Sequence, residues 1–178
     1  VLGICHFPSL HAAMAATKEI VALDPAAVEL VDRVMIELAR DIALFRPVIE
    51  RFVEGAPAAL LLVEFAGADG EENRRRLRRL EELMADLGHP GAVVRAVDPA
   101  FQRAVWEVRQ HGLNIMMSMK GDGKPVSFIE DCAVPLEDLP DYTARLTAIF
   151  EKHGTTGTWY AHASVGCLHV RPILNLKE

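Results

Sequence analysis

Short apolar segments of strand length alternate with amphipathic helical segments along this chain, and this alternation most limits the folds that it can adopt. The strand segments are residues 2–7, 27–31, 58–65, 92–97 and 126–131, followed by a closing pair at 156–162 and 168–172. Residues 58–65 are almost continuously apolar, which predicts a strand in the interior of a sheet. Repeated β-α-β units that end in a hairpin predict an α+β fold of ferredoxin-like repeats, with a mainly antiparallel sheet and helices covering one face.

Helical periodicity and capping residues place helices between these strands. The predicted helices span residues 10–22, 32–44, 71–87, about 99–111 and an amphipathic segment that begins between 135 and 139. Ser9 and Asp98 are suitable N-caps, and Gly88 is a suitable C-terminal stop. Pro47 is expected to disrupt the end of the helix at 32–44.

A doubly wound parallel sheet is the alternative architecture. Its fingerprint is missing, because no GxGxxG motif follows a strand and no GxxxxGK motif with a following Ser or Thr occurs. At 178 residues the chain has the usual size of one domain, so residues 1–178 are interpreted as a single domain. The chain begins at Val1 without a methionine, which suggests a piece of a longer protein.

Charge and cysteine content argue against several classes of function. The net charge is −6 and the arginines at 74–79 are flanked by glutamates, so a nucleic-acid partner is not expected. Cys5, Cys132 and Cys167 form no CxxC pair, so neither a disulfide framework nor a thiolate zinc site is indicated. This cysteine usage suits a cytoplasmic location, and no apolar run approaches the roughly 20 residues that cross a bilayer.

Residues 159–172, W-Y-A-H-A-S-V-G-C-L-H-V-R-P, gather more candidate chemistry than any other segment. His162 and His169 are seven residues apart, so a straight strand would point them to opposite faces. They share a site only if the backbone bends between them, and Gly166 permits a bend because glycine adopts positive φ without steric penalty. Two converging imidazoles begin a divalent-metal site, which usually needs a third ligand. Two unrelated histidines, one packed and one exposed, are the alternative.

The segment H-A-S-V-G-C-L-H at 162–169 resembles the H-x-G-D-G-N-x-H motif in the C-terminal domain of FAD-linked oxidases. This family contains D-2-hydroxyglutarate dehydrogenase, D-lactate dehydrogenase and glycolate oxidase. V-W-E-V-R at 105–109 and S-F-I-E-D-C-A-V-P at 127–135 are similar to its W-x-x-R and E-D-x-x-x-P segments, in the same order. The tail H-V-R-P-x-L-N-L is similar to long bacterial members that combine flavin and iron-sulfur modules.

The resemblance implies an FAD-dependent oxidoreductase that oxidises a D-2-hydroxyacid, such as 2-hydroxyglutarate, lactate or glycolate, by hydride transfer to flavin. It implies that His162 and His169 are catalytic ligands of a divalent metal, commonly zinc in the family. Arg109 falls on the arginine that binds the substrate carboxylate. Arg171 stands where several relatives have a substrate-contacting asparagine, and an arginine there favours a second carboxylate on the substrate.

The resemblance also implies partners outside these residues. The FAD is expected to be held mainly by an N-terminal domain, and an iron-sulfur module is a further expected partner. The third metal ligand of the family, a glutamate in a later E-H-G segment, is expected beyond Glu178, so the isolated fragment is expected to bind metal poorly and to be inactive. Ser164, Val165 and Cys167 depart from the Gly, Asp and Asn of the motif. Exposed sheet edges make a homodimer of the fragment a candidate assembly.

Several of these residues have alternative interpretations. Cys167 beside His169 suggests a Cys/His nucleophile, but no oxyanion loop is evident and a buried thiol is more common. Glu130 and Asp131 are adjacent, so on a regular strand they face opposite ways and do not form one acid/base pair. Arg109 has the alternative of a surface ion pair. For the whole chain, the alternative is a ferredoxin-like dimerisation or regulatory module without catalytic residues.

Overall fold

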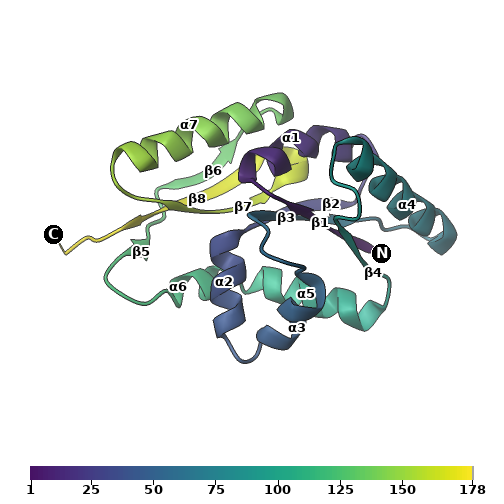
Figure 1. Cartoon of the computed structure of the whole chain (residues 1–178), viewed down its shortest axis with the longest axis horizontal. Helices are drawn as coiled ribbons and strands as arrows, with labels where there is room; N and C mark the ends of the chain where they lie inside the picture. Colours follow the sequence, from purple (N-terminus) through teal and green to yellow (C-terminus); the bar gives the residue numbers. More distant parts are fainter. Residues whose placement is uncertain (178) are drawn as a thin grey trace.

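The structure is a computed structural model that describes residues 1–177. Within this range, eight strands form a sheet in the order β4-β1-β3-β2-β7-β8-β5, and β6 pairs with β8 (Figure 1). The strands are β1 (Leu2–Phe7), β2 (Ala27–Asp32), β3 (Ala59–Glu64), β4 (Val93–Ala96), β5 (Lys124–Pro125), β6 (Ile129–Ala133), β7 (Gly157–His162) and β8 (Cys167–Leu174). Every pair of neighbouring strands is antiparallel, which excludes the doubly wound parallel sheet.

Seven α-helices connect or flank these strands in the described range. They are α1 (Leu10–Val21), α2 (Arg33–Asp41), α3 (Arg46–Phe52), α4 (Gly70–Asp86), α5 (Pro99–Gln110), α6 (Gly112–Met117) and α7 (Leu139–Lys152), with short 3-10 turns η1 (Leu136–Asp138) and η2 (Ala163–Val165). Ser9 and Asp98 cap α1 and α5, as the sequence predicts. The predicted helix at 32–44 is shorter, and α3 follows it. Pro47 lies in the first turn of α3, where its missing N–H has no helical partner to lose.

The same four-element arrangement occurs twice in the sheet. In the first unit, β1-α1-β2-β3, strand β3 lies between β1 and β2, and α4 and β4 complete a ferredoxin-like order. In the second unit, β6-α7-β7-β8, strand β8 lies between β6 and β7 in the same way. Pairing of β2 with β7 joins the two units into one sheet. The predicted α+β fold with ferredoxin-like repeats and an antiparallel sheet is therefore confirmed.

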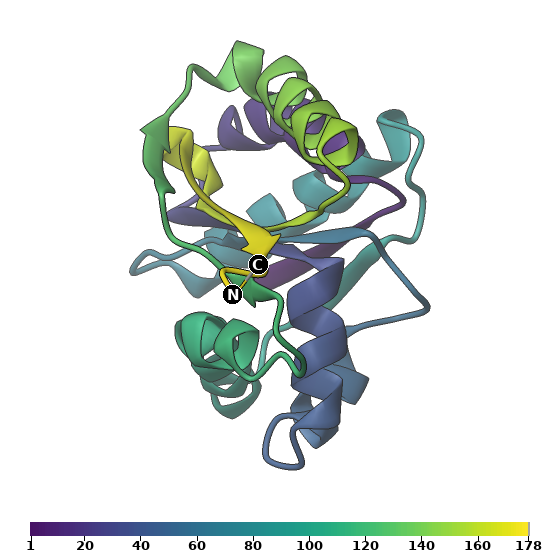
Figure 2. The ribbon, with the colours of Figure 1, turned by 90° about the vertical axis from the view of Figure 1, so that its left-hand side faces the viewer.

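Helices cover both faces of this sheet, whereas the sequence predicts them on one face. Helices α1, α4 and α7 lie on one side, and α2, α3, α5 and α6 lie on the other (Figures 1 and 2). Strand β3 explains the second layer, because Leu61 and Val63 belong to one apolar core while Leu60 and Leu62 belong to the other. A strand that is apolar on both faces needs a cover on each. None of the described helices has the length and apolar character to cross a bilayer.

Asp32 connects three elements from inside the protein. It is only 5% exposed, and its carboxylate accepts hydrogen bonds from the backbone N–H of Met35 in α2 (2.9 Å) and of Trp159 in β7 (2.8 Å). Burial raises the pKa of Asp32 to about 7, although these N–H donors favour the charged form and oppose the shift. The carboxyl therefore changes charge near neutral pH while it joins β7 to the first unit.

We expect Asp32 to make the free energy of unfolding depend on pH. Its folded pKa lies above its ordinary value of 3.8, so its contribution is fully present below pH 3.8 and is lost as pH rises to about 7. The loss should be on the order of 2–4 kcal/mol. Urea unfolding of the wild type and Asp32→Asn at pH 5 and pH 8 measures it as the difference between their pH dependences. An equal pH dependence in both proteins would contradict the assignment.

Candidate functional site

The β7–β8 hairpin brings His162 and His169 to one face of the sheet. Tyr160 pairs with His169 across the strands and His162 pairs with Cys167, so these side chains share a face. The turn closes through η2 and Gly166, whose φ is +66°. The two imidazole rings are 5.1 Å apart between centroids, edge to face. The bend expected from the sequence is present, and the seven-residue separation spans two strands rather than one.

Glu29 on β2 connects this hairpin to helix α5. One carboxylate oxygen lies 2.7 Å from an Nη of Arg109, and the other lies 2.8 Å from Nδ1 of His162. The Arg109 guanidinium also lies 5.0 Å from the centre of the Tyr160 ring. Arg109 is thus held in the site by a largely buried ion pair, not on a helix surface. Glu29 was missed as a site residue, although a carboxylate within a strand that is otherwise half-apolar was the available signal.

A bulge in β6 brings Glu130 and Asp131 to the same side, contrary to the sequence prediction that they face opposite ways. The register of β6 against β8 shifts between Ile129 and Cys132, and Asp131 has φ +55°, in the left-handed region. Nδ1 of His169 therefore lies 2.9 Å from a carboxylate oxygen of Asp131 and 3.3 Å from one of Glu130. Alternation along a strand fails here because the strand is not regular.

Arg171 completes this group of side chains on β8. Its Nε lies 2.6 Å from a carboxylate oxygen of Glu130, and an Nη lies 3.4 Å from the Tyr160 hydroxyl. The ring of Tyr160 stacks on His169 with 4.7 Å between centroids. We call the assembled residues the polar cluster; its members are Glu29, Arg109, Glu130, Asp131, Tyr160, His162, Cys167, His169 and Arg171.

The polar cluster contains nearly all of the unpartnered buried polar atoms of the described side chains. Four such atoms are found: Nε of Arg109, Nδ1 of His169, Nε of Arg171 and Oγ1 of Thr158. Thr158 pairs with Arg171 across the strands, so it adjoins the cluster. Nδ1 of His169 and Nε of Arg171 have carboxylate oxygens close by, but these oxygens lie off the N–H direction and satisfy no hydrogen bond. Such atoms are rare in folded proteins and often mark functional sites.

The two histidines have the surroundings of metal ligands. A carboxylate only accepts hydrogen bonds, so Nδ1 of His162 donates to Glu29 and Nε2 remains free as a ligand atom. A carboxylate that holds the other ring nitrogen is the usual support of a metal-binding histidine. His162 is 52% exposed, which leaves that nitrogen accessible. The donor set of the polar cluster, imidazole and carboxylate, therefore fits a divalent metal.

Cys167 has the surroundings of an inert thiol when no metal is bound. Burial, followed by the nearby carboxylate of Asp131, raises the pKa of the Cys167 thiol. The thiolate is the nucleophilic form, so a raised pKa weakens the free thiol as a nucleophile at neutral pH. This observation argues against the Cys/His nucleophile.

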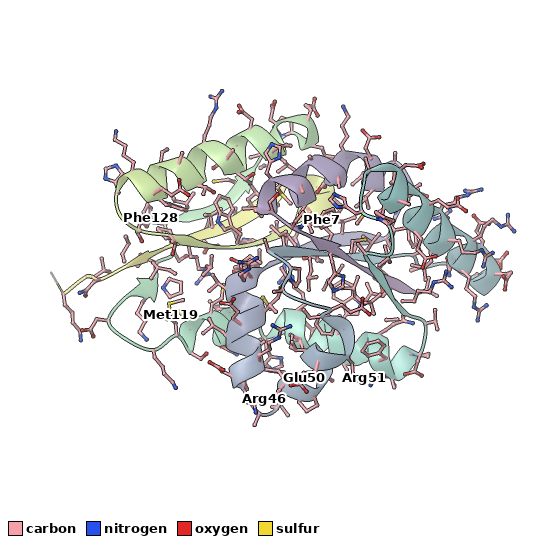
Figure 3. The ribbon with its side chains drawn as sticks, viewed as in Figure 1. Phe7, Arg46, Glu50, Arg51, Met119 and Phe128 are labelled. Atoms are coloured by element: carbon pink, nitrogen blue, oxygen red, sulfur yellow. The ribbon has the colours of Figure 1, made fainter. Side chains whose placement is uncertain are left out.

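The larger hollows on the described surface lie away from the polar cluster. One lies between α1 and α7 and is lined by residues such as Leu10 and Thr147. Another is an apolar hollow of α7, β6 and β8 that includes Ile149 and Phe128, and Phe128 is 64% exposed beside α7 (Figure 3). The polar cluster belongs to neither, so its chemistry is carried by a sheet face.

The chain is similar to known proteins over its full length. A model of the family described as FAD linked oxidases, C-terminal domain, matches residues 1–178. D-2-hydroxyglutarate dehydrogenase of Escherichia coli (strain K12) is 32% identical over 161 residues, covering 85% of this chain and 16% of that protein. D-2-hydroxyglutarate dehydrogenase of Haemophilus influenzae is 30% identical over 181 residues, covering 97% of this chain and 18% of that protein.

Solved structures show the same fold at low sequence identity. A structure of alkyldihydroxyacetonephosphate synthase superposes with a TM-score of 0.65 at 12% identity, covering 99% of this chain and 37% of that chain. The chain spans less than a fifth of the length of the curated relatives it matches. Because the family match extends from residue 1 to residue 178, the chain belongs to the C-terminal domain family of the FAD-linked oxidases.

Proposed function

We propose that this chain is the substrate-binding domain of an FAD-dependent dehydrogenase that oxidises a D-2-hydroxyacid, with a dicarboxylate such as D-2-hydroxyglutarate as the substrate class. The observation that carries the proposal is the concentration of unpartnered buried nitrogens from Arg109, His169 and Arg171 on one sheet face. Buried charged groups are costly unless they are fully paired. A purely structural dimerisation module would have no reason to retain them, whereas an anionic ligand supplies the missing acceptors.

Arg109 and Arg171 suit the two ends of a dicarboxylate. Each guanidinium is a planar fork of donors that can bind a carboxylate through two parallel hydrogen bonds. Glu29 and Glu130 already hold one side of Arg109 and Arg171, respectively, which fixes their orientation before a substrate arrives. The curated relatives carry the name D-2-hydroxyglutarate dehydrogenase, which agrees with a substrate that has two carboxylates.

His162 and His169 are proposed as ligands of a divalent metal beside these arginines. A divalent metal in such a site polarises the substrate hydroxyl and carboxylate as a Lewis acid. Glu29 orients His162 through Nδ1, and stacking against Tyr160 orients His169. Their proximity to Arg109 and Arg171 is what would bring the hydroxyl-bearing carbon and the carboxylates of one substrate into a common position.

FAD is the cofactor of the family, and in this proposal another domain of the same polypeptide holds most of it. Bound flavin supplies the acceptor for the hydride of the substrate carbon. The sequence of this chain has no glycine-rich phosphate loop, and its candidate residues lie on a sheet face that a second domain can cover. An iron-sulfur module, a homodimer and a cytoplasmic location stay predictions.

A panel of D-2-hydroxyacids tests the proposal in the flavin-containing polypeptide, with anaerobic bleaching of the flavin as the signal. We expect D-2-hydroxyglutarate to bleach the flavin faster than D-lactate. Arg171→Met should lower kcat/KM for D-2-hydroxyglutarate by roughly 10- to 100-fold, because a charged hydrogen bond to the distal carboxylate is lost. D-lactate lacks that carboxylate, so its kcat/KM should change much less. Equal losses for both substrates would contradict the role of Arg171, and no bleaching by any D-2-hydroxyacid would contradict the function.

A further inference from the structure

Three potential metal-binding atoms come together on β6 and β8. One ligand atom each from Asp131, Cys167 and His169 lies within 4.8 Å of the other two. Cys167 and His169 are two residues apart on β8 and therefore share a face. The bulge of β6 turns Asp131 toward them. The three residues are a carboxylate, a thiol and an imidazole, which are the three classes of side chain that bind zinc in proteins.

The separation of these atoms is close to that of ligands around one ion. With metal-to-ligand bonds of 2.0–2.3 Å, two ligands of a tetrahedral zinc lie roughly 3.3–3.7 Å apart. Closing the present spacing requires a side-chain adjustment of about 1 Å or a little more, within ordinary rotamer freedom. Asp131 is 76% exposed, so its carboxylate is free to make this movement.

The contact between His169 and Asp131 has the geometry of two ligands rather than of a hydrogen bond. Their closest atoms are 2.9 Å apart, yet Nδ1 of His169 has no hydrogen-bond partner. Two ligands of one ion aim their lone pairs at the ion and not at each other, so they lie near one another without a hydrogen-bond direction. The unpartnered nitrogen of His169 is thus available to an ion between the two side chains.

Charge in the polar cluster also favours a divalent cation. Three carboxylates, those of Glu29, Glu130 and Asp131, face two guanidinium groups, those of Arg109 and Arg171. If Cys167 binds as a thiolate, the cluster carries two negative charges in excess. One divalent cation neutralises that excess, and metal binding itself displaces the thiol proton.

We propose that Cys167 and Asp131 are, together with His169, ligands of a zinc-class divalent metal. The inference rests on the proposed function for the use of this metal with substrate, and it deepens that function by naming two ligands within this chain. Thiolate and imidazole ligands select zinc over magnesium, calcium or manganese. His162 lies directly across from Cys167 on β7, so its free Nε2 is available as a fourth ligand.

Cobalt(II) titration of the chain of residues 1–178 tests this assignment without any turnover. A cobalt–thiolate bond gives an intense near-ultraviolet charge-transfer band that oxygen and nitrogen ligands do not give. We expect this band in the wild type, its disappearance in Cys167→Ser, and at least a tenfold weaker cobalt affinity in both Cys167→Ser and Asp131→Asn. Cys132→Ser is the matched control, because Cys132 lies on the adjacent strand and hydrogen-bonds with Tyr142 instead; its band should equal that of the wild type.

Three results would overturn the proposal: no cobalt bound by the wild type, cobalt bound without a thiolate band, or an unchanged band in Cys167→Ser. Circular dichroism of the metal-free proteins checks folding, and Cys167→Asn serves in the same way if the serine variant does not fold. The outcome is separate from that of the substrate panel. A thiolate band in a chain whose parent oxidises no hydroxyacid leaves the metal site standing, whereas turnover with no thiolate band overturns the ligand assignment alone.

Discussion

Replacing Arg109 by lysine is expected to lower kcat/KM for the D-2-hydroxyacid by about 100-fold or more, an effect of roughly 3 kcal/mol on the transition state. Lysine keeps a positive charge beside Glu29, so the largely buried ion pair is retained. It has no planar fork, however, and one ammonium cannot hold Glu29 and also bind a substrate carboxylate through two parallel bonds. The unpartnered Nε of Arg109 is the donor that this substitution removes from the site.

The measurement is the initial rate of anaerobic flavin reduction over a range of substrate concentrations in the flavin-containing polypeptide. Arg103→Lys is the matched control, because Arg103 is an exposed arginine on the same helix and should retain wild-type kinetics. Thermal unfolding of both variants should stay close to that of the wild type. A similar kcat/KM in Arg103→Lys and Arg109→Lys would remove Arg109 from the substrate site.

Gly166→Ala is expected to lower the free energy of unfolding by roughly 3 kcal/mol or more, because it combines an unfavourable backbone conformation with a steric clash. Gly166 has φ +66°, and a Cβ at this position would lie 1.9 Å from the carbonyl oxygen of Val134. The same backbone accepts a hydrogen bond from Val134 N–H at 2.9 Å, so the turn cannot move away without losing a contact with the segment after β6. The substitution should therefore separate β6 from the hairpin that carries the histidines.

Gly154→Ala separates the two causes. Gly154 has almost the same φ, +67°, but a Cβ added at this position would meet no atom within 4 Å. The control should lose only about 1 kcal/mol, the cost of placing alanine in the left-handed region. Urea unfolding followed by circular dichroism measures both variants. Equal losses in the two proteins would show that the contact with Val134 has no energetic weight.

Local sequence patterns were sufficient for much of the fold. Ser9 and Asp98 act as caps where they were expected, and the apolar run that contains β3 lies in the interior of the sheet. The second helical layer was not foreseen, because helical periodicity shows that a helix has an apolar face but not which side of the sheet receives it. The helix α3 was missed for a related reason, since Pro47 marks a helix start as well as a helix end.

The candidate site was predicted only in part. A motif and its resemblance to a family pointed to His162, His169, Arg109 and Arg171, and the structure places all four in one cluster. Their carboxylate neighbours depend on strand pairing and on an irregular β6, which no short pattern encodes. Contacts between residues far apart in the chain are decided by the tertiary fold, so local reasoning reaches the ligands before it reaches the groups that orient them.

The ion pairs of Glu29 also have a consequence for how the protein reaches its native state. This carboxylate contacts Arg109 and His162, which lie 80 and 133 residues further along the chain. Loops of that length close late and slowly, since their entropy is lost before the contacts form. No partly folded chain that lacks β7 can present the complete cluster. During refolding, recovery of metal or substrate binding should therefore lag behind recovery of helical circular dichroism and report the last step of assembly.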